Sequence, residues 1–213
     1  FCLLCPVIAE NGAMIIGSLA MVLLAAYICY IVHAVVVYSM AVKTMGGLSP
    51  LQFFKGMLPA IMFAFSSASS VGTLPINLEC VEKLGSDREI ASFVLPLGAT
   101  INMDGTAIYQ GVCAIFIASC YGINLTLSQM LTVILTATLA SIGTAGVPGA
   151  GMVMLAMVLT SVGLPVDGIA LVAGVDRIFD MGRTTVNITG DASCSIIVSN
   201  LEKRREAKLA KEL

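Results

Sequence analysis

The chain has 213 residues, of which 58% are hydrophobic and only 11% are charged, and its formal net charge is −2. Soluble domains are usually about a quarter charged, so with a mean hydropathy of +0.97 this chain is not an ordinary soluble fold. The composition instead predicts lipid solvation over much of the surface. The near-neutral charge indicates no nucleic-acid partner. The seven cysteines are scattered without CxxC spacing, which predicts buried apolar side chains rather than disulfides or metal ligands.

The first long apolar stretch, residues 13–43, has no acidic or basic side chain before Lys43 except His33. A bilayer-spanning helix needs about 20 apolar residues, so we predict a transmembrane helix here and expect His33 to be an ordinary helix residue, far from the acids. Residues 88–121 and 165–201 are predicted as two further spans, although both contain ionisable side chains.

The chain begins at Phe1, already apolar, and lacks the basic start and cleavage site of a signal peptide. We therefore expect an N-terminally truncated fragment in which residues 1–12 end a preceding helix.

Two other apolar segments, residues 48–85 and 127–163, are interrupted near the middle by SSASSVGTLP (66–75) and SIGTAGVPGAG (141–151). The flanking halves, about 10–15 residues each, are too short to cross a bilayer. Irregular backbone survives at membrane depth only where protein or water satisfies its polar groups, and paired interrupted segments indicate a transporter binding site. We predict two re-entrant hairpins, with two Gly/Pro-kinked ordinary helices as the alternative.

Loop charges help to choose between these topologies, because basic residues in short loops favour the cytoplasm. Lys43, Lys83 and Arg88 flank the first interrupted segment, whereas residues 121–130 carry no charge. If both segments are hairpins, all basic loops lie inside; if each segment crossed once, Lys83 and Arg88 would lie outside. The charges favour hairpins and a cytoplasmic, helical tail at residues 202–213.

The predicted span at 165–201 carries a polar stripe. At 100° per residue, its polar side chains fall within a sector of about 100°, and they are Asp176, Asp180, Arg183, Thr184, Asn187 and Asp191. One charge at the bilayer centre costs roughly 3 kcal/mol or more, so the stripe must face protein or water.

Together with Asp104, this stripe sets four carboxylates against one guanidinium, a net charge of −3. Unpaired buried carboxylates either protonate or recruit cations. The neutral oxygens of Asn102, Thr106, Thr184 and Asn187 suit a small alkali ion. The sequence therefore predicts cation binding, without choosing Na⁺ over H⁺.

Arg183 is the one basic residue among these acids. A guanidinium can grip a carboxylate through two parallel hydrogen bonds, which indicates an anionic substrate; the alternative is a permanent ion pair with Asp176 or Asp180. The two interpretations are compatible if Asp176 pairs with Arg183 in the empty site while Asp180 faces a substrate ammonium. Arg177 lies at the edge of the stripe, and we expect it to extend toward the membrane interface.

Three motifs, NMDGTAIYQG (102–111), GTAGVPGAG (143–151) and DMGRTTVNITGD (180–191), resemble the dicarboxylate/amino acid:cation symporter family, the glutamate transporter superfamily. The likeness covers essentially the whole chain and is closest to prokaryotic sodium–aspartate and sodium–glutamate members. It implies an all-α integral membrane fold, an elevator-type transport domain with three transmembrane helices and two oppositely oriented re-entrant hairpins, the second being the extracellular gate. It also implies further helices before this chain and a homotrimer in the cell membrane.

The resemblance also implies functional residues. The substrate would contact Ser70, Thr106, Val147, Gly151, Asp180, Arg183, Thr184 and Asn187, with Asp180 on the ammonium, Arg183 on the side-chain carboxylate and the Ser70 amide on the α-carboxylate. One sodium site would use Asp191 with carbonyls of Gly98, Asn102 and Asn187; a second would use carbonyls of Thr100, Ser141, Ile142 and Thr144; a third would use Asn102 and Asp104. Apart from Na⁺ as the coupling ion, no cofactor is implied.

This chain departs from the family pattern at the first interruption, where relatives often have an unbroken serine run and this chain has Ala68 and Val71. We expect modest effects on affinity there, because the contacts of this hairpin are largely made by the main chain.

The leading hypothesis is a sodium-coupled symporter for aspartate or glutamate. The alternatives are a proton-coupled or C4-dicarboxylate carrier of the same family and, from another class, a channel or a membrane sensor. An enzyme is not expected, because the sequence contains no Ser/His, HExxH or GxGD-like pair.

Overall fold

The structure is a computed structural model that describes Cys5, Ala9, Gly12 and residues 14–212. Within those residues every regular element is a helix, which confirms the all-α prediction. The predicted end of a preceding helix at residues 1–12 lies outside the described residues, apart from the three named positions.

The first described element is a long helix. It begins as α2 (Met14–His33), passes through a π-helical stretch (Ala34–Tyr38) and the short α3 (Ser39–Ala41), and closes with a second π-helical stretch (Val42–Gly46). It ends at Gly47, whose φ of 71° only glycine adopts readily. π-helical turns are rare and occur frequently at functional sites.

The first interrupted segment forms two helices, α4 (Pro50–Ser67) and α5 (Ser70–Lys83), which pack against each other. Ser49 caps α4, and its hydroxyl accepts from the Gln52 amide at 3.2 Å. The break between the helices is short: Ala68 adopts a left-handed conformation, and Ser69 caps α5.

The second interrupted segment likewise forms α8 (Leu127–Ser141) and α9 (Ala150–Ser161), which also pack against each other. Thr126 and Gln129 form a capping box that starts α8. The longer break, residues 142–149, contains two glycines with φ of 82°, Gly143 and Gly149. The Ser- and Gly-rich runs therefore mark the two breaks.

The NMDGT motif separates α6 (Arg88–Ile101) from α7 (Asp104–Cys120). Only Asn102 and Met103 leave the helical conformation, with φ/ψ of −109°/82° and −118°/53°. Asp104 therefore opens α7.

The last predicted span has different bounds from those expected. A 3₁₀ turn (Val166–Gly168) and α10 (Ile169–Ala173) precede α11 (Asp176–Glu212), so the expected helix over 165–201 is divided before Asp176. The helix then continues past residue 201 into the expected tail, because residues 202–212 are almost all strong helix formers (Glu, Lys, Arg, Ala and Leu).

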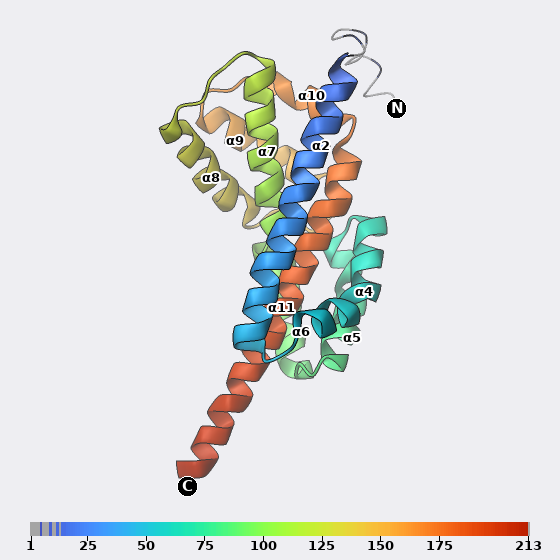
Figure 1. Ribbon diagram of the computed structural model, residues 1–213, viewed down its shortest axis with the longest axis vertical. Helices are drawn as coiled ribbons and strands as arrows, with labels where there is room; N and C mark the ends of the chain where they lie inside the picture. Colours follow the sequence, from blue (N-terminus) through green and yellow to red (C-terminus); the bar gives the residue numbers. More distant parts are fainter. Residues whose placement is uncertain (1–4, 6–8, 10–11, 13, 213) are drawn as a thin grey trace.

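The helix α11 is the centre of the fold and packs against α2, α4, α5, α6 and α7. In Figure 1, α4, α5 and α6 lie beside its lower part, whereas α7, α8 and α9 lie to one side of its upper part. Two helical stretches of the described residues, Ile15–Gly46 and Arg88–Cys120, are long and apolar enough to cross a membrane.

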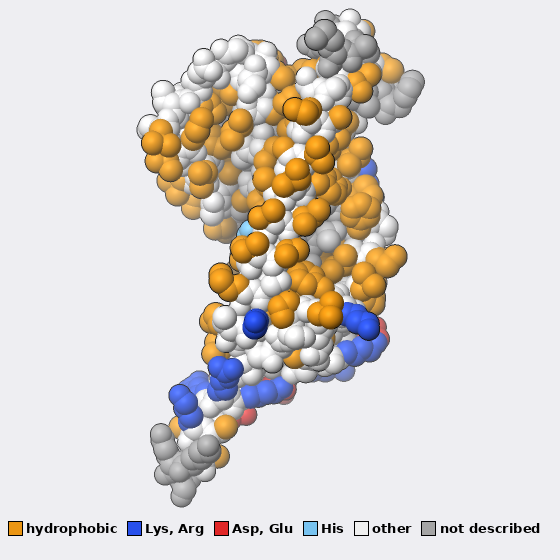
Figure 2. Space-filling model, viewed as in Figure 1, with side chains coloured by type: hydrophobic (Ala, Val, Ile, Leu, Met, Phe, Trp, Pro, Cys, Tyr) orange, Lys and Arg blue, Asp and Glu red, His pale blue; other side chains and the backbone are white. Residues whose placement is uncertain are grey.

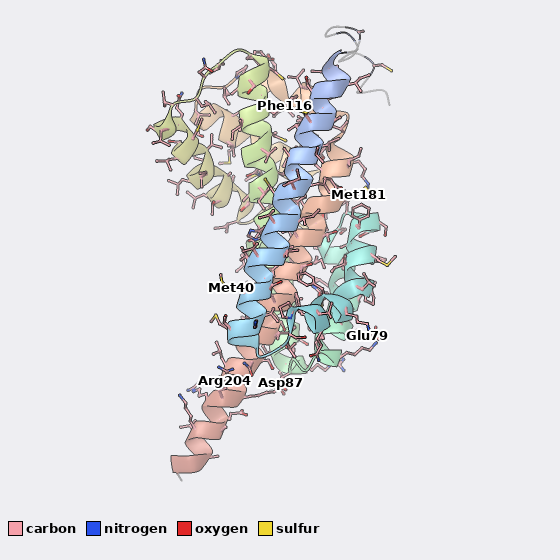
Figure 3. All side chains as sticks on the ribbon, in the orientation of Figure 1. Met40, Glu79, Asp87, Phe116, Met181 and Arg204 are labelled. Atoms are coloured by element: carbon pink, nitrogen blue, oxygen red, sulfur yellow. The ribbon has the colours of Figure 1, made fainter. Side chains whose placement is uncertain are left out.

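Charged side chains gather at one end of the molecule. Figure 2 shows apolar side chains over the body and most visible Lys and Arg atoms at the lower end. In Figure 3, Asp87 and Arg204 are labelled at this end, where α11 leaves the bundle. An ion pair between Lys203 and Asp87 (3.4 Å) links α11 to the start of α6 there.

Candidate functional site

The N-terminal part of α11 carries a buried cluster of one arginine and two acids. Arg183 donates through Nε to Asp180 Oδ1 at 2.8 Å, and its Nη1 lies 3.4 Å from Asp176 Oδ1. The three residues are at most 7% exposed. The helical spacings of three and seven residues place both acids on the face that bears Arg183.

The rest of the Arg183 guanidinium faces Tyr109 on α7. Its central carbon lies 4.5 Å from the centre of the Tyr109 ring, a cation–π distance. Its Nη2 is buried and has no hydrogen-bond partner. The guanidinium thus keeps donor capacity that a carboxylate could use. Sequence reasoning missed Tyr109; its position inside the NMDGTAIYQG motif was the one available signal.

A small cavity adjoins this cluster. All eight residues predicted to contact the substrate line it, and they are Ser70, Thr106, Val147, Gly151, Asp180, Arg183, Thr184 and Asn187. Met103, Ala145 and Gly146, which the sequence did not single out for this role, complete the lining with Thr144. The cavity volume is about 10 Å³, which is room for about one water molecule. A larger ligand therefore requires one wall to move.

The break between α8 and α9 forms one wall of this cavity. The Gly149 amide donates to Asp180 Oδ2 at 2.8 Å. The Gly146 carbonyl accepts from the Val71 amide (3.2 Å) and the Ser69 hydroxyl (3.1 Å). The two breaks, far apart in sequence, therefore touch each other beside the cavity, which Ser70 and Gly146 both line.

Asn187 connects α11 to the NMDGT break. Its Oδ1 accepts from the Gly105 amide at 2.8 Å, and its Nδ2 lies 3.2 Å from Thr106 Oγ1 and 3.0 Å from the Met103 sulfur. These contacts satisfy the Asn187 amide and hold the start of α7 against α11.

One turn further along α11, Asp191 is 1% exposed. Its Oδ1 accepts from Asn102 Nδ2 at 2.9 Å, whereas its Oδ2 has no hydrogen-bond partner. Asn102 Nδ2 also lies 3.5 Å from the Asn187 carbonyl. Gly98 faces the carboxylate so closely that a Cβ there would overlap Asp191 Oδ1. The structure thus brings together Gly98, Asn102, Asn187 and Asp191, around an acidic oxygen that lacks a donor.

The second predicted ligand group lies where α6 meets the end of α8. The Thr100 carbonyl accepts from the Gly143 amide at 2.7 Å, next to Ile142, and the Ser141 carbonyl accepts from the Thr144 amide at 3.1 Å. In the described part of the chain, no three His, Cys, Asp or Glu side chains gather in a metal-binding group. The predicted sets draw mainly on carbonyl oxygens.

The expectation that His33 lies far from the acids is wrong. His33 Nε2 lies 3.1 Å from Asp104 Oδ2, and the Tyr38 hydroxyl donates to the same oxygen at 2.8 Å. Helical periodicity orders the residues of one helix but does not say which helix packs against it. Here α2 packs along α7 and brings His33 to Asp104, a member with Asn102 of the third predicted ligand group.

Arg177 is exposed and makes contacts that the sequence did not predict: its guanidinium donates to the carbonyls of Ser66 (2.7 Å) and Ser67 (3.3 Å) at the end of α4. Its expected extension toward the membrane interface stays a prediction.

Comparison with known proteins decides the family. The model of the sodium:dicarboxylate symporter family matches residues 1–201 of this chain. The chain belongs to this family. The resemblance carried by the three motifs is thereby confirmed, and the family that matches is named for symport rather than for an enzyme activity.

The family member named excitatory amino acid transporter 1 of Rattus norvegicus is 44% identical over 195 residues, which cover 91% of this chain and 36% of the relative. Excitatory amino acid transporter 2 of Homo sapiens is 43% identical over 205 residues (95% and 36%). An excitatory amino acid transporter of Caenorhabditis elegans is 51% identical over 156 residues (73% and 31%). The chain thus spans about a third of the length of these relatives. A particular likeness to prokaryotic members stays a prediction, since these three relatives are animal proteins.

Proposed function

We propose that this chain supplies the substrate and cation sites of a sodium-coupled symporter that takes up aspartate or glutamate. The observation that carries the proposal is the buried Arg183, which lines the predicted substrate cavity, pairs with two acids and retains an Nη2 without a hydrogen-bond partner. Relatives named excitatory amino acid transporters support an amino acid substrate.

In this proposal the two ends of the substrate meet opposite charges. Arg183 binds the side-chain carboxylate, and Asp180 binds the ammonium group. The Ser70 amide, at the start of α5, donates to the α-carboxylate, where the amides of a helix N-terminus favour an anion. Thr106, Thr184 and Asn187 contribute further hydrogen bonds, and backbone near Val147 and Gly151 closes over the substrate.

In this proposal Na⁺ is transported together with the amino acid. Asp191 Oδ2, buried without a donor, is the strongest argument for a cation at Gly98, Asn102, Asn187 and Asp191, because an unpaired buried carboxylate is costly. The carbonyls of Thr100, Ser141, Ile142 and Thr144 form the second proposed site, and Asn102 with Asp104 contributes to the third. Cations at these positions offset the excess negative charge of the carboxylates and so favour binding of an anionic substrate.

The proposed setting is the cell membrane, in a protein with additional helices that assembles as a homotrimer. The pairs α4–α5 and α8–α9 are proposed to be the two re-entrant hairpins of an elevator-type transport domain, entering from opposite sides, with α8–α9 as the extracellular gate. The basic end of the molecule, which includes residues 202–212, is proposed to face the cytoplasm, in agreement with the positive-inside rule.

The deciding experiment replaces Arg183 by Cys in the full-length protein reconstituted in liposomes. We expect sodium-driven uptake of labelled aspartate to be lost and uptake of a small neutral amino acid to be gained, because the pocket loses its one cationic group. Arg204→Cys, which removes an exposed arginine of the same helix, is the matched control. Unchanged aspartate uptake in Arg183→Cys would exclude the substrate assignment.

Uptake measurements in the same liposomes distinguish the proposed function from proton coupling and from transport of a C4-dicarboxylate. Uptake that ignores sodium but collapses with the pH gradient would support proton coupling. Inhibition of aspartate uptake by succinate would support a C4-dicarboxylate substrate.

A further inference from the structure

The turn between α4 and α5 contains a strained residue. Ala68 has a φ of 54° and is the one non-glycine residue with positive φ in the described part of the chain. In this conformation the Cβ of an L-residue crowds the following carbonyl, so glycine is the usual residue at such a helix end. Contacts with the surrounding structure must therefore stabilise the left-handed conformation of Ala68.

Arg177 makes one of the contacts that hold this turn from outside. Its Nη2 donates to the Ser66 carbonyl at 2.7 Å and its Nη1 to the Ser67 carbonyl at 3.3 Å. These are the last two residues of α4, where carbonyls lack intrahelical partners and the helix dipole is negative. Arg177 of α11 therefore supplies hydrogen-bond donors for these carbonyls and a positive charge opposite the negative end of the helix dipole. Figure 1 shows the upper end of the α4–α5 pair beside α11.

The turn leads directly into the substrate cavity. Ser69 caps α5 by accepting from the Gly72 amide at 3.0 Å, and Ser70, the first residue of α5, lines the cavity. On its other side the turn meets the second break, because the Ser69 hydroxyl and the Val71 amide both donate to the Gly146 carbonyl. A shift of the turn would move the Ser70 amide and the surface on which residues 143–149 rest.

We propose that Arg177 is a positioning residue: by binding the Ser66 and Ser67 carbonyls it holds the α4–α5 turn, with Ala68 left-handed, so that Ser70 faces the substrate and the turn meets the second break at Gly146. Its effect on transport rests on the proposed function. Its effect on the turn does not.

The experiment compares Arg177→Ala, Arg177→Lys and the control Arg204→Ala in full-length protein in liposomes. We expect Arg177→Ala to raise the KM for aspartate by roughly tenfold, the effect of losing about one charge-assisted hydrogen bond. The maximal rate should change by less than about twofold, because the groups that bind substrate remain. Arg177→Lys, which keeps the charge but not the fork of donors, should recover part of the affinity.

Ala68→Gly tests the strain directly. Because glycine adopts positive φ without crowding, the turn should depend less on Arg177 in that background, and Arg177→Ala should then raise KM by less than about threefold. An equal effect of Arg177→Ala in both backgrounds would overturn the proposed mechanism.

Amide hydrogen exchange in the absence of substrate provides a readout independent of transport. Arg177→Ala should speed exchange of the amides of residues 66–72 by at least about tenfold, while amides of residues 190–198 of α11 exchange as in the parent protein. Unchanged exchange at 66–72 would exclude the positioning role. If the parent protein shows no aspartate uptake at all, the proposed function fails, and the exchange result still decides the role of Arg177.

Discussion

Asp180 and Gly149 are joined by a hydrogen bond of 2.8 Å between the carboxylate Oδ2 and the backbone amide. The other oxygen of Asp180 accepts from Arg183. The acid proposed to bind the substrate ammonium is thus the same acid that holds the 142–149 break against the cavity. A substrate ammonium that binds Oδ2 would either share this oxygen with the Gly149 amide or displace it, so substrate binding acts on the same contact that holds this break.

Asp180→Asn is expected to weaken aspartate binding by at least about 30-fold, because it removes a charged partner of the ammonium group. The variant should also loosen the 142–149 break, detected as faster amide exchange there. Binding is measured by titration of the full-length protein with aspartate at saturating sodium. Asp167→Asn, which alters an exposed acid outside the site, is the control and should bind as the parent does. Parental affinity in Asp180→Asn would contradict the ammonium role.

Asp191→Asn should raise the sodium concentration for half-maximal uptake by about tenfold or more, because the buried oxygen without a donor becomes part of a neutral amide. At saturating sodium, aspartate affinity should change much less, since Asp191 does not line the substrate cavity. Sodium-dependence curves at fixed aspartate provide the measurement, again with Asp167→Asn beside it. An unchanged sodium curve would remove Asp191 from the cation site.

Gly146→Ala should weaken substrate binding by separating the two breaks. A Cβ at Gly146 would lie 3.0 Å from the Ala99 carbonyl oxygen and 3.1 Å from Ser70 Cβ, tighter than ordinary van der Waals contact. We expect an increase in KM of roughly fivefold to tenfold, equivalent to about 1–1.4 kcal/mol. Gly111→Ala is the control, because nothing lies within 4 Å of a Cβ there. Equal KM values for the two variants would indicate that the breaks do not need this close approach.

Gly105→Ala should destabilise the fold by about 1–3 kcal/mol, the usual cost of overpacking a filled interior. A Cβ at Gly105 would overlap the Arg183 backbone, which cannot rotate away as a side chain could. The thermal unfolding midpoint of the full-length protein in detergent reports this loss. Gly111→Ala should instead leave the midpoint unchanged or raise it, since alanine favours a helix interior by about 1 kcal/mol over glycine. A midpoint for Gly105→Ala equal to that of the parent would show that α7 can shift away from α11.

The sequence predicted features that depend on one helix or one short run of residues. The polar stripe of α11 is an example, because 3.6 residues per turn determine which side chains share a face. Both breaks were also located, since Ser, Gly and Pro runs disfavour continuous helix. One bound was not predicted, because nothing in the apolar pattern separated α10 from α11 before Asp176, whereas the tail is helical as expected, as a continuation of α11.

Contacts between different helices required the tertiary structure. His33 and Asp104 are 71 positions apart, and Arg177 and Ser66 are 111 apart. No period or spacing relates such residues, because each pair depends on how two helices cross. The sequence by itself therefore determined which chemical groups this protein carries and on which helical face each lies. Only the packing of the helices decided that His33 meets Asp104, that Arg177 binds the end of α4, and that the two breaks touch each other beside the cavity that Asp180 lines.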